Sequence, residues 1–308
     1  MMAGVPAALG RAIALSLVAL IASAAALLRH TAEAIAPAAA EAQLDVPAMP
    51  ADVAGPLAFG FRSVLADFTF LEAIQLLALR KASQPSTETI PLDRALDRLL
   101  TYAVDVDPKF GGAYRFAAAA LPHETVDNKV MGVVAAAAIL DRGVRELPDE
   151  WRIWFLLGFI RGYYLHEYAE AARCMAQAAR LPGSPRYLGL LATRLGVQGG
   201  ELQLATDLAE GMLAQANEEQ TRKQWEDRLR DLYMERDLRA IDAASRRWLE
   251  EHGAPPPSLR ALVAAGFLSH EPREPHGGRY VLDAEGRGRS TAAERLTVYG
   301  GSARLEVH

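Results

Sequence analysis

His166 and Glu167, adjacent in the middle of the chain, come closest to a catalytic motif. Zinc peptidases carry H-E-x-x-H on a helix, where two histidines bind the metal and the glutamate acts as the base. Position 170 is Glu170, so the second histidine of that motif is missing. Four further histidines lie in predicted loops or turns without paired ligand spacing: His123, His252, His270 and His276. No nucleophile-elbow, P-loop or dinucleotide fingerprint is present either, so we expect no enzyme activity, no metal and no cofactor.

The composition favours a mainly helical protein that does not bind nucleic acid. Half of its 308 residues are hydrophobic, aromatics make up 7%, and strand-forming runs of Val, Ile and Thr are scarce before residue 279. The net charge is -5 and no basic cluster stands out, whereas nucleic-acid-binding surfaces gather Lys and Arg. Cys174 is the single cysteine, so it forms no disulfide within the chain, and its helical context predicts a small buried side chain.

The N-terminal segment predicts export or membrane attachment. Residues 12–28 are 17 uncharged residues, bounded by Arg11 and Arg29. A helix of this length covers roughly 25 Å, slightly less than the hydrocarbon core of a bilayer. We interpret residues 1–30 as an uncleaved signal anchor, with the body in the periplasm on the outer side of an inner membrane. Cleavage of a signal peptide near residues 37–42, giving an exported soluble chain, is the alternative. Residues 31–57, rich in Ala and Pro, are expected to be a linker.

A repeated pattern of helix pairs occupies the middle of the chain. Pro148 and Pro182 are 34 residues apart, and the segment between them has a W-x-x-L-G start and a second helix with regularly spaced small residues. The packing positions of this unit are Trp154, Leu157, Gly158, Ala171, Ala178 and Pro182. Pro108 and Pro148 are 40 residues apart, which fits one repeat with an insertion at residues 123–128. Tyr114 and Leu188 take the position of Trp154 in the neighbouring units.

These motifs and this period resemble the tetratricopeptide-repeat family over residues 92–216. The resemblance implies an α-solenoid of stacked helix pairs, which we place at residues 58–250. The unit at Trp154 departs from the family in two ways: Arg161 stands where the first helix normally carries tyrosine, and the second helix is shifted by one residue. Residues 61–81 have a helical stripe of apolar side chains that is expected to form the first helix and cap the solenoid. Residues 218–253 form a highly charged helical segment with a polar outer face, as terminal units need.

The resemblance also implies a peptide groove lined by the first helix of each unit. The family's groove positions fall here on Arg115, Arg152, Phe155, Phe159, Arg186 and Thr193. Three arginines beside two aromatic rings would suit an acidic or carboxylate-ended peptide, because Arg pairs bidentately with carboxylates. The alternative is that the two phenylalanines belong to the core and the arginines are merely solvated.

Residues 251–308 are expected to form a small α/β tail. Ser258 is placed to cap a short helix that Gly266 ends, and a β-hairpin with its turn at residues 283–286 follows. The order of helix, proline, short helix and hairpin over residues 240–290 resembles the carboxy-terminal part of type II secretion pseudopilins. The acidic calcium loop and the prepilin N-terminus of that family are missing here.

Taken together, these features predict a membrane-anchored scaffold that binds protein partners during assembly of an envelope complex. Its partners would be acidic or carboxylate-ended peptides or subunits of a membrane complex, with residues 12–28 in the bilayer. The competing prediction is a permanently bound accessory subunit of secretion, pilus or transport machinery that uses its outer faces and no groove. Exposed apolar patches away from the groove would favour this second prediction.

Overall fold

The computed structural model describes residues 50–58, 60–82, 90–125 and 129–296, and these are mainly helical. The predicted membrane segment at residues 12–28 and most of the predicted linker lie outside the described residues. None of the described helices combines the length and the hydropathy needed to cross a membrane. The last residues of the predicted linker form a short helix, α2 (Ala51–Leu57), whose Ala54 is buried against α3 and α4.

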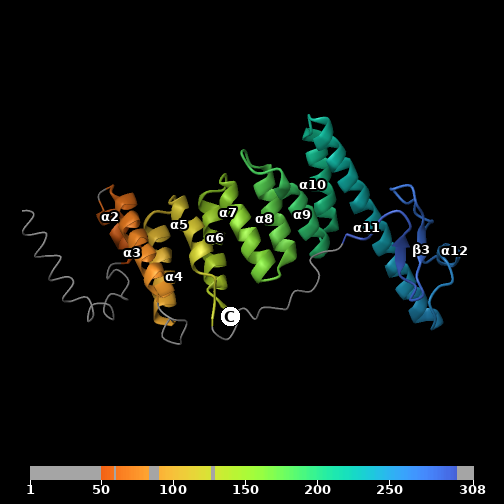
Figure 1. The fold of residues 1–308 in the computed structure, drawn as a ribbon, viewed down its shortest axis with the longest axis horizontal. Coiled ribbons are helices and arrows are strands. Elements are labelled where there is room, and N and C mark those ends of the chain that lie inside the picture. Colours follow the sequence, from red (N-terminus) through yellow and green to blue (C-terminus); the bar gives the residue numbers. More distant parts are fainter. Residues whose placement is uncertain (1–49, 59, 83–89, 126–128, 297–308) are drawn as a thin grey trace, which may run out of the picture.

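Helices α3 to α10 form four consecutive pairs that stand side by side in a row (Figure 1). The pairs are α3 (Arg62–Ala82) with α4 (Ile90–Val106), α5 (Gly111–Ala120) with α6 (Val133–Glu146), α7 (Trp151–Phe159) with α8 (Tyr168–Arg180), and α9 (Tyr187–Gln198) with α10 (Leu202–Gln215). Each helix packs mainly on its neighbours in the sequence, and alternate helices such as α5 and α7 also touch. The core therefore runs along the row instead of closing into a globule.

The predicted insertion lies between the two helices of the second pair. It carries two short antiparallel strands, β1 (His123–Glu124) and β2 (Val130–Met131). His123 Nε2 lies 3.2 Å from Asp93 of α4, and Arg80 of α3 donates to the same carboxylate over 3.1 Å. The insertion is thus held against the first pair by polar contacts.

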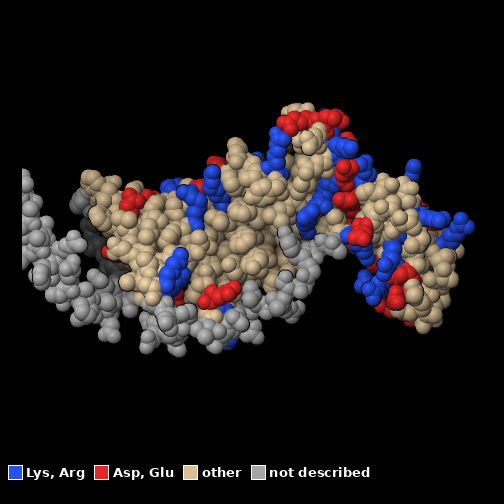
Figure 2. Space-filling view, in the orientation of Figure 1, with Lys and Arg blue, Asp and Glu red and all other residues tan. Residues whose placement is uncertain are grey.

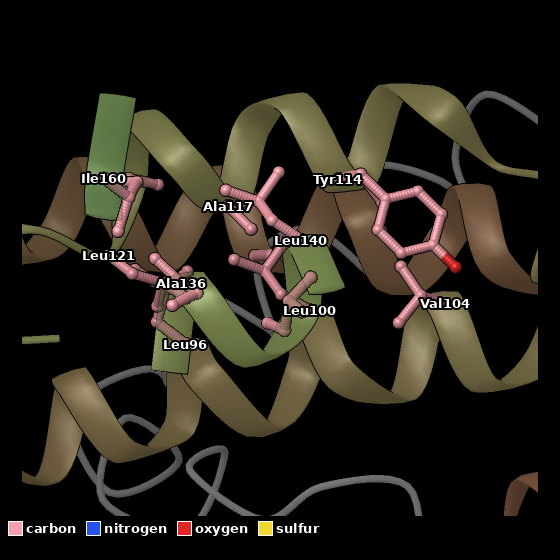
Figure 3. Close-up of a cluster of buried hydrophobic side chains, with 14 of the residues drawn as sticks. Leu96, Leu100, Val104, Tyr114, Ala117, Leu121, Ala136, Leu140 and Ile160 are labelled. Atoms are coloured by element: carbon pink, nitrogen blue, oxygen red, sulfur yellow. The ribbon is translucent and has the colours of Figure 1, made fainter. Parts of the chain in front are cut away.

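The largest hydrophobic cluster joins the first three pairs (Figure 3). Its fully buried side chains come from α4, α5, α6 and the end of the α7 segment, among them Leu100, Tyr114, Leu140 and Ile160. Tyr114 occupies the position predicted for a large repeat residue, and its hydroxyl donates to Pro108 O over 3.1 Å. Burial of the ring raises the pKa of Tyr114 to about 12, so the phenol keeps its proton and this hydrogen bond at neutral pH.

The helix α7 ends in a π-helical turn, η2 (Ile160–Tyr164), in which Leu165 N donates to Ile160 O over 3.2 Å. A π-turn contains one residue more than an α-turn. This extra residue accounts for the one-residue shift that the sequence shows in the second helix of the Trp154 unit. His166 follows with a positive φ of 57°, a conformation that few residues other than glycine adopt, and lets the chain reverse into α8.

Helix α11 (Glu219–His252) connects the row to the tail. Trp225, Leu229 and Leu232 pack on α9 and α10, while Leu238 and Ile241 pack on the tail. Gly253 ends the helix in the left-handed conformation, with a φ of 70°. The highly charged segment predicted from the sequence is therefore one continuous helix with two buried contact regions.

The tail contains α12 (Leu259–Ala264) and an antiparallel hairpin of β3 (Tyr280–Leu282) and β4 (Gly288–Ser290). Ser258 Oγ accepts a hydrogen bond from Ala261 N, as the predicted cap requires. Tyr280 OH donates to Asp237 over 3.2 Å, and Arg295 donates to Asp242 over 2.7 Å. The order of elements predicted for the tail is confirmed, and these polar contacts fix it to α11.

Replacing Leu140 by Ala tests whether the cluster of the first three pairs holds the row together. Leu140 is fully buried, so we expect Leu140→Ala to lower the free energy of unfolding by about 2–5 kcal/mol. Val134 lies on the same helix with an exposed fraction of 61%, so Val134→Ala is the matched control and should cost less than about 0.5 kcal/mol. Urea unfolding followed by circular dichroism measures both, and similar losses in the two variants would contradict the assigned packing.

Candidate protein-interaction surfaces

One side of α7 presents the central groove candidates together. Arg152, Phe155 and Phe159 are three and four residues apart, so they lie on one side of the helix. Arg152 and Phe159 are exposed, whereas Phe155 is half-buried and packs against the cluster of α8, α9 and α10. The structure therefore brings these three predicted residues to one surface, with one phenylalanine shared between surface and core.

The π-turn extends this surface with two tyrosines. The rings of Phe159 and Tyr163 stack with centroids 5.2 Å apart and planes 8° from parallel, and Tyr164 meets both rings edge-on. Tyr163 has an exposed fraction of 57% and Phe159 one of 40%. At the other end of α7, the Arg152 guanidinium lies 4.6 Å from the centre of the Trp151 ring. We call Arg152, Phe155, Phe159 and Tyr163 the aromatic face. Tyr163 was missed in the sequence because the groove positions were counted on a regular α-helix.

Two predicted groove arginines are neutralised by glutamates of the chain itself. Arg115 of α5 donates to Glu150, which precedes α7. Arg186, which precedes α9, makes a bidentate pair with Glu218 at 2.7 and 2.8 Å, and Glu218 precedes α11. The partners are 35 and 32 residues apart, so each pair connects one unit to the next. A carboxylate ligand would have to displace these glutamates, so among the three predicted groove arginines only Arg152 makes no ion pair with a described residue.

Thr193 does not belong to an exposed surface. Its side chain is fully buried, and its hydroxyl donates to Leu190 O within α9 over 2.8 Å. A threonine that satisfies its hydroxyl on its own helix packs like a small apolar residue. The prediction that Thr193 lines the groove is therefore wrong, because counting from Leu188 ignores how deeply this turn of α9 is covered.

The predicted packing residues lie at the contact between α7 and α8. A Cβ added to Gly158 would lie 3.1 Å from the Met175 side chain and 3.2 Å from Ala171 O, so the two helices approach closely at this glycine. Leu157, Ala171 and Ala178 are buried. Trp154 is half-buried and donates its indole N–H to Pro148 O over 2.8 Å. Pro182 lies exposed in the turn after α8.

Helix α3 exposes much of its apolar stripe to solvent. Phe61, Val64, Phe68, Leu71 and Ile74 are all exposed, and Phe68 has an exposed fraction of 63%. The packed side of the helix carries the buried residues Ala66, Thr69, Ala73 and Leu76 together with the half-buried Phe70 and Leu77. The prediction of a helix over residues 61–81 is confirmed. We call the five exposed residues the α3 stripe.

Charged side chains are concentrated on α11 and the tail. In Figure 2 they gather over α11 and the tail, while most of the surface over the helix pairs is uncharged in this view. Many of the charges on α11 are paired, as in Glu235, which is buried between Arg239 at 3.0 Å and Arg295 at 3.4 Å. Desolvation lowers the pKa of the buried Arg228 guanidinium, which donates to Leu190 O and lies 3.7 Å from Asp231.

The described residues contain no group of three or more His, Cys, Asp or Glu side chains placed to hold a metal ion. The pair singled out by the sequence, His166 and Glu167, lies exposed in the turn before α8. His166 Nδ1 contacts Tyr168 OH over 3.0 Å, and Glu167 accepts from Arg161 over 3.1 Å. Both side chains therefore contact other residues of the same turn region.

Comparison with protein families, with curated proteins and with solved structures finds nothing that matches this chain.

Proposed function

We propose that this protein is a membrane-anchored scaffold of tetratricopeptide-like helix pairs that binds protein partners in the assembly of an envelope complex. The observation that carries this proposal is the aromatic face, which exposes stacked rings on the middle unit of a row of helix pairs. The row itself supports the family resemblance, since each pair packs on its neighbours and buries small residues such as Ala171 and Ala178.

The chemistry of the aromatic face suits a protein partner. Tyr, Trp, Phe and Arg are the residues that most often dominate binding energy at protein interfaces. Tyr163 and Phe159 are held by stacking within the π-turn, so little side-chain entropy is lost when a partner covers them. Arg152 makes no ion pair with a described residue and offers one guanidinium to a carboxylate of the partner.

Residues 12–28 are the proposed anchor, with the helical body outside the inner membrane. Deleting residues 1–30 should release the protein from carbonate-washed membranes, because a linker rich in Ala and Pro gives no comparable hydrophobic attachment. The full chain is the control and should remain in the membrane pellet. Retention of the shortened chain in the pellet would contradict the anchor, and a mature chain starting near residues 37–42 would establish the exported soluble alternative.

Truncating the stacked rings should weaken partner binding. The double variant Phe159→Ala with Tyr163→Ala is expected to reduce the amount of co-purified partner tenfold or more, in line with a hot-spot loss of about 2 kcal/mol or above. Leu249 is a similarly exposed apolar residue on α11, so Leu249→Ala is the matched control and should leave recovery unchanged. Quantitative mass spectrometry of tagged protein from detergent-treated membranes measures the ratio, and equal recovery from both variants would count against the aromatic face.

The α3 stripe supports a second candidate function, that of a permanently bound accessory subunit. Phe61, Val64, Phe68 and Leu71 follow the alternating spacing of three and four residues by which helices pack side by side. Asp67 and Glu72 flank the stripe, and neither makes an ion pair with a described residue. The occupant that fits is a helix of a membrane-complex subunit with an apolar seam and basic flanks. The resemblance of the tail to pseudopilins adds secretion or pilus machinery as the class of complex.

Substitution within the stripe separates the two candidates. Phe68→Ser with Leu71→Ser should release the protein from a stoichiometric complex if α3 is a permanent interface, because two large apolar contacts are lost. Val134→Ser, at an equally exposed position on α6, is the control and should change nothing. Blue native electrophoresis of detergent-solubilised membranes gives the readout. A complex of unchanged size in the stripe variant would reject the accessory-subunit candidate.

A further inference from the structure

A cleft of about 600 Å³ lies between α6 and α8, in the size range of ligand and side-chain binding sites. Its apolar surface comes from Val144, Trp154, Leu157 and Leu204, and arginines from α6, η2 and α8 surround it. The cleft therefore combines an apolar surface with a charged rim, as sites that bind a side chain in a fixed orientation do.

The cleft and the aromatic face occupy opposite sides of α7. Trp154, Leu157 and Arg161 line the cleft, whereas Arg152, Phe155 and Phe159 form the aromatic face. At 3.6 residues per turn, these two sets are separated by about half a turn around the helix axis. A ligand in the cleft would thus leave the aromatic face free.

Two of the four arginines that line the cleft are paired with carboxylates. The lining contains Arg145, Arg161, Arg173 and Arg180 with the carboxylates of Asp141 and Glu170, and Glu167 and Glu201 lie 3.1 Å from Arg161 and 3.0 Å from Arg173. All four carboxylates are already engaged. Arg161 donates to the two oxygens of Asp141 over 2.9 and 2.8 Å, and Arg173 donates to Glu170 over 2.9 Å.

Arg145 and Arg180 are the two cleft arginines without such a partner. Both side chains are exposed, and neither makes a hydrogen bond or an ion pair with another described residue. One further donor is unsatisfied, because Arg161 Nε is buried without a hydrogen-bond acceptor among the described residues. Two guanidinium groups without a carboxylate partner among the described residues, beside the half-buried Trp154, favour an anionic ligand.

The π-turn explains why Arg161 lies in the cleft. Glu167 N donates to Arg161 O over 2.8 Å, so the turn folds back over this residue and places Glu167 beside its guanidinium. The nearby Cys174 thiol supplies no negative charge or nucleophile. Burial raises its pKa to about 12, which keeps the thiol protonated at neutral pH. The cleft is therefore equipped for binding rather than for thiolate chemistry.

We propose that this cleft binds a segment of a partner protein in which a carboxylate side chain stands next to an aliphatic or aromatic side chain. Arg145 and Arg180 pair with the carboxylate, and the apolar side chain lies against Val144, Trp154 and Leu157. A free inorganic anion would leave this apolar surface exposed to water, so a peptide segment fits the whole cleft better. Arg161 and Arg173 keep their own carboxylates and hold the walls in place.

Selection from a display library of random octapeptides on the full chain in detergent tests the proposal. We expect enriched peptides to carry Asp or Glu beside Leu, Ile, Phe or Trp, and a synthetic peptide of that type to bind in fluorescence anisotropy. Replacing its acidic residues by the corresponding amides should weaken binding tenfold or more. The double variant Arg145→Ala with Arg180→Ala should weaken binding to the same extent, because both ion-pairing partners of the carboxylate are removed.

Two control variants test whether a loss of peptide affinity is specific to the cleft. Arg260→Ala removes an exposed arginine of α12 and should leave peptide affinity unchanged. The double variant Phe159→Ala with Tyr163→Ala alters the aromatic face and should also leave peptide affinity unchanged. The proposal for the cleft and the proposed function can therefore fail independently of each other. Enrichment without acidic residues, no enrichment, or equal binding by the double arginine variant would overturn the proposal. Self-association of the protein that is abolished by Arg145→Ala with Arg180→Ala would also overturn the proposal, because a second copy of the chain would then occupy the cleft.

Discussion

The whole row of helices depends on close contacts between small residues and large side chains at the points where helices cross. A Cβ added to Gly143 would lie 2.8 Å from the Tyr114 ring, and one added to Gly189 would lie 2.9 Å from the Trp225 ring. Gly158 meets Met175 in the same manner. Such contacts fix the spacing between helices, because the interior is close-packed and a single methyl group has no room. Each pair can bury its apolar side only by placing it against the next pair.

This way of packing decides which side chains remain available for function. On α3 the small residues Ala66 and Ala73 face the core, and large side chains on another side of the helix, such as Phe68 and Leu71, remain exposed. One side of α7 packs on α8. Two other sides of the helix, which lie opposite each other, carry the aromatic face and the cleft. Ion pairs such as Arg115 with Glu150 connect successive units across these surfaces. The surfaces proposed for binding are thus what remains after the helices have packed as closely as they can.

The sequence predicted the parts of the fold that follow from period and from local signals. Proline spacing and the W-x-x-L-G pattern located the helix pairs, and Ser258 located the short helix of the tail. The sequence predicted α3 but not which of its apolar side chains are exposed, because a helical period does not show which side a neighbouring helix covers. The ion pair of Arg186 with Glu218 could not be predicted from local sequence patterns, since the two residues are 32 positions apart. The cleft could not be predicted at all, because four helices contribute to it.

The central claim is that the aromatic face meets a protein partner while the chain is anchored at the membrane. The most direct measurement places a photo-crosslinking amino acid at position 163, and for comparison at position 249 on α11, and identifies crosslinked proteins in native membranes by mass spectrometry. The account predicts a defined protein crosslinked from position 163 and not from position 249. The same products from both positions, or none from position 163, would contradict it.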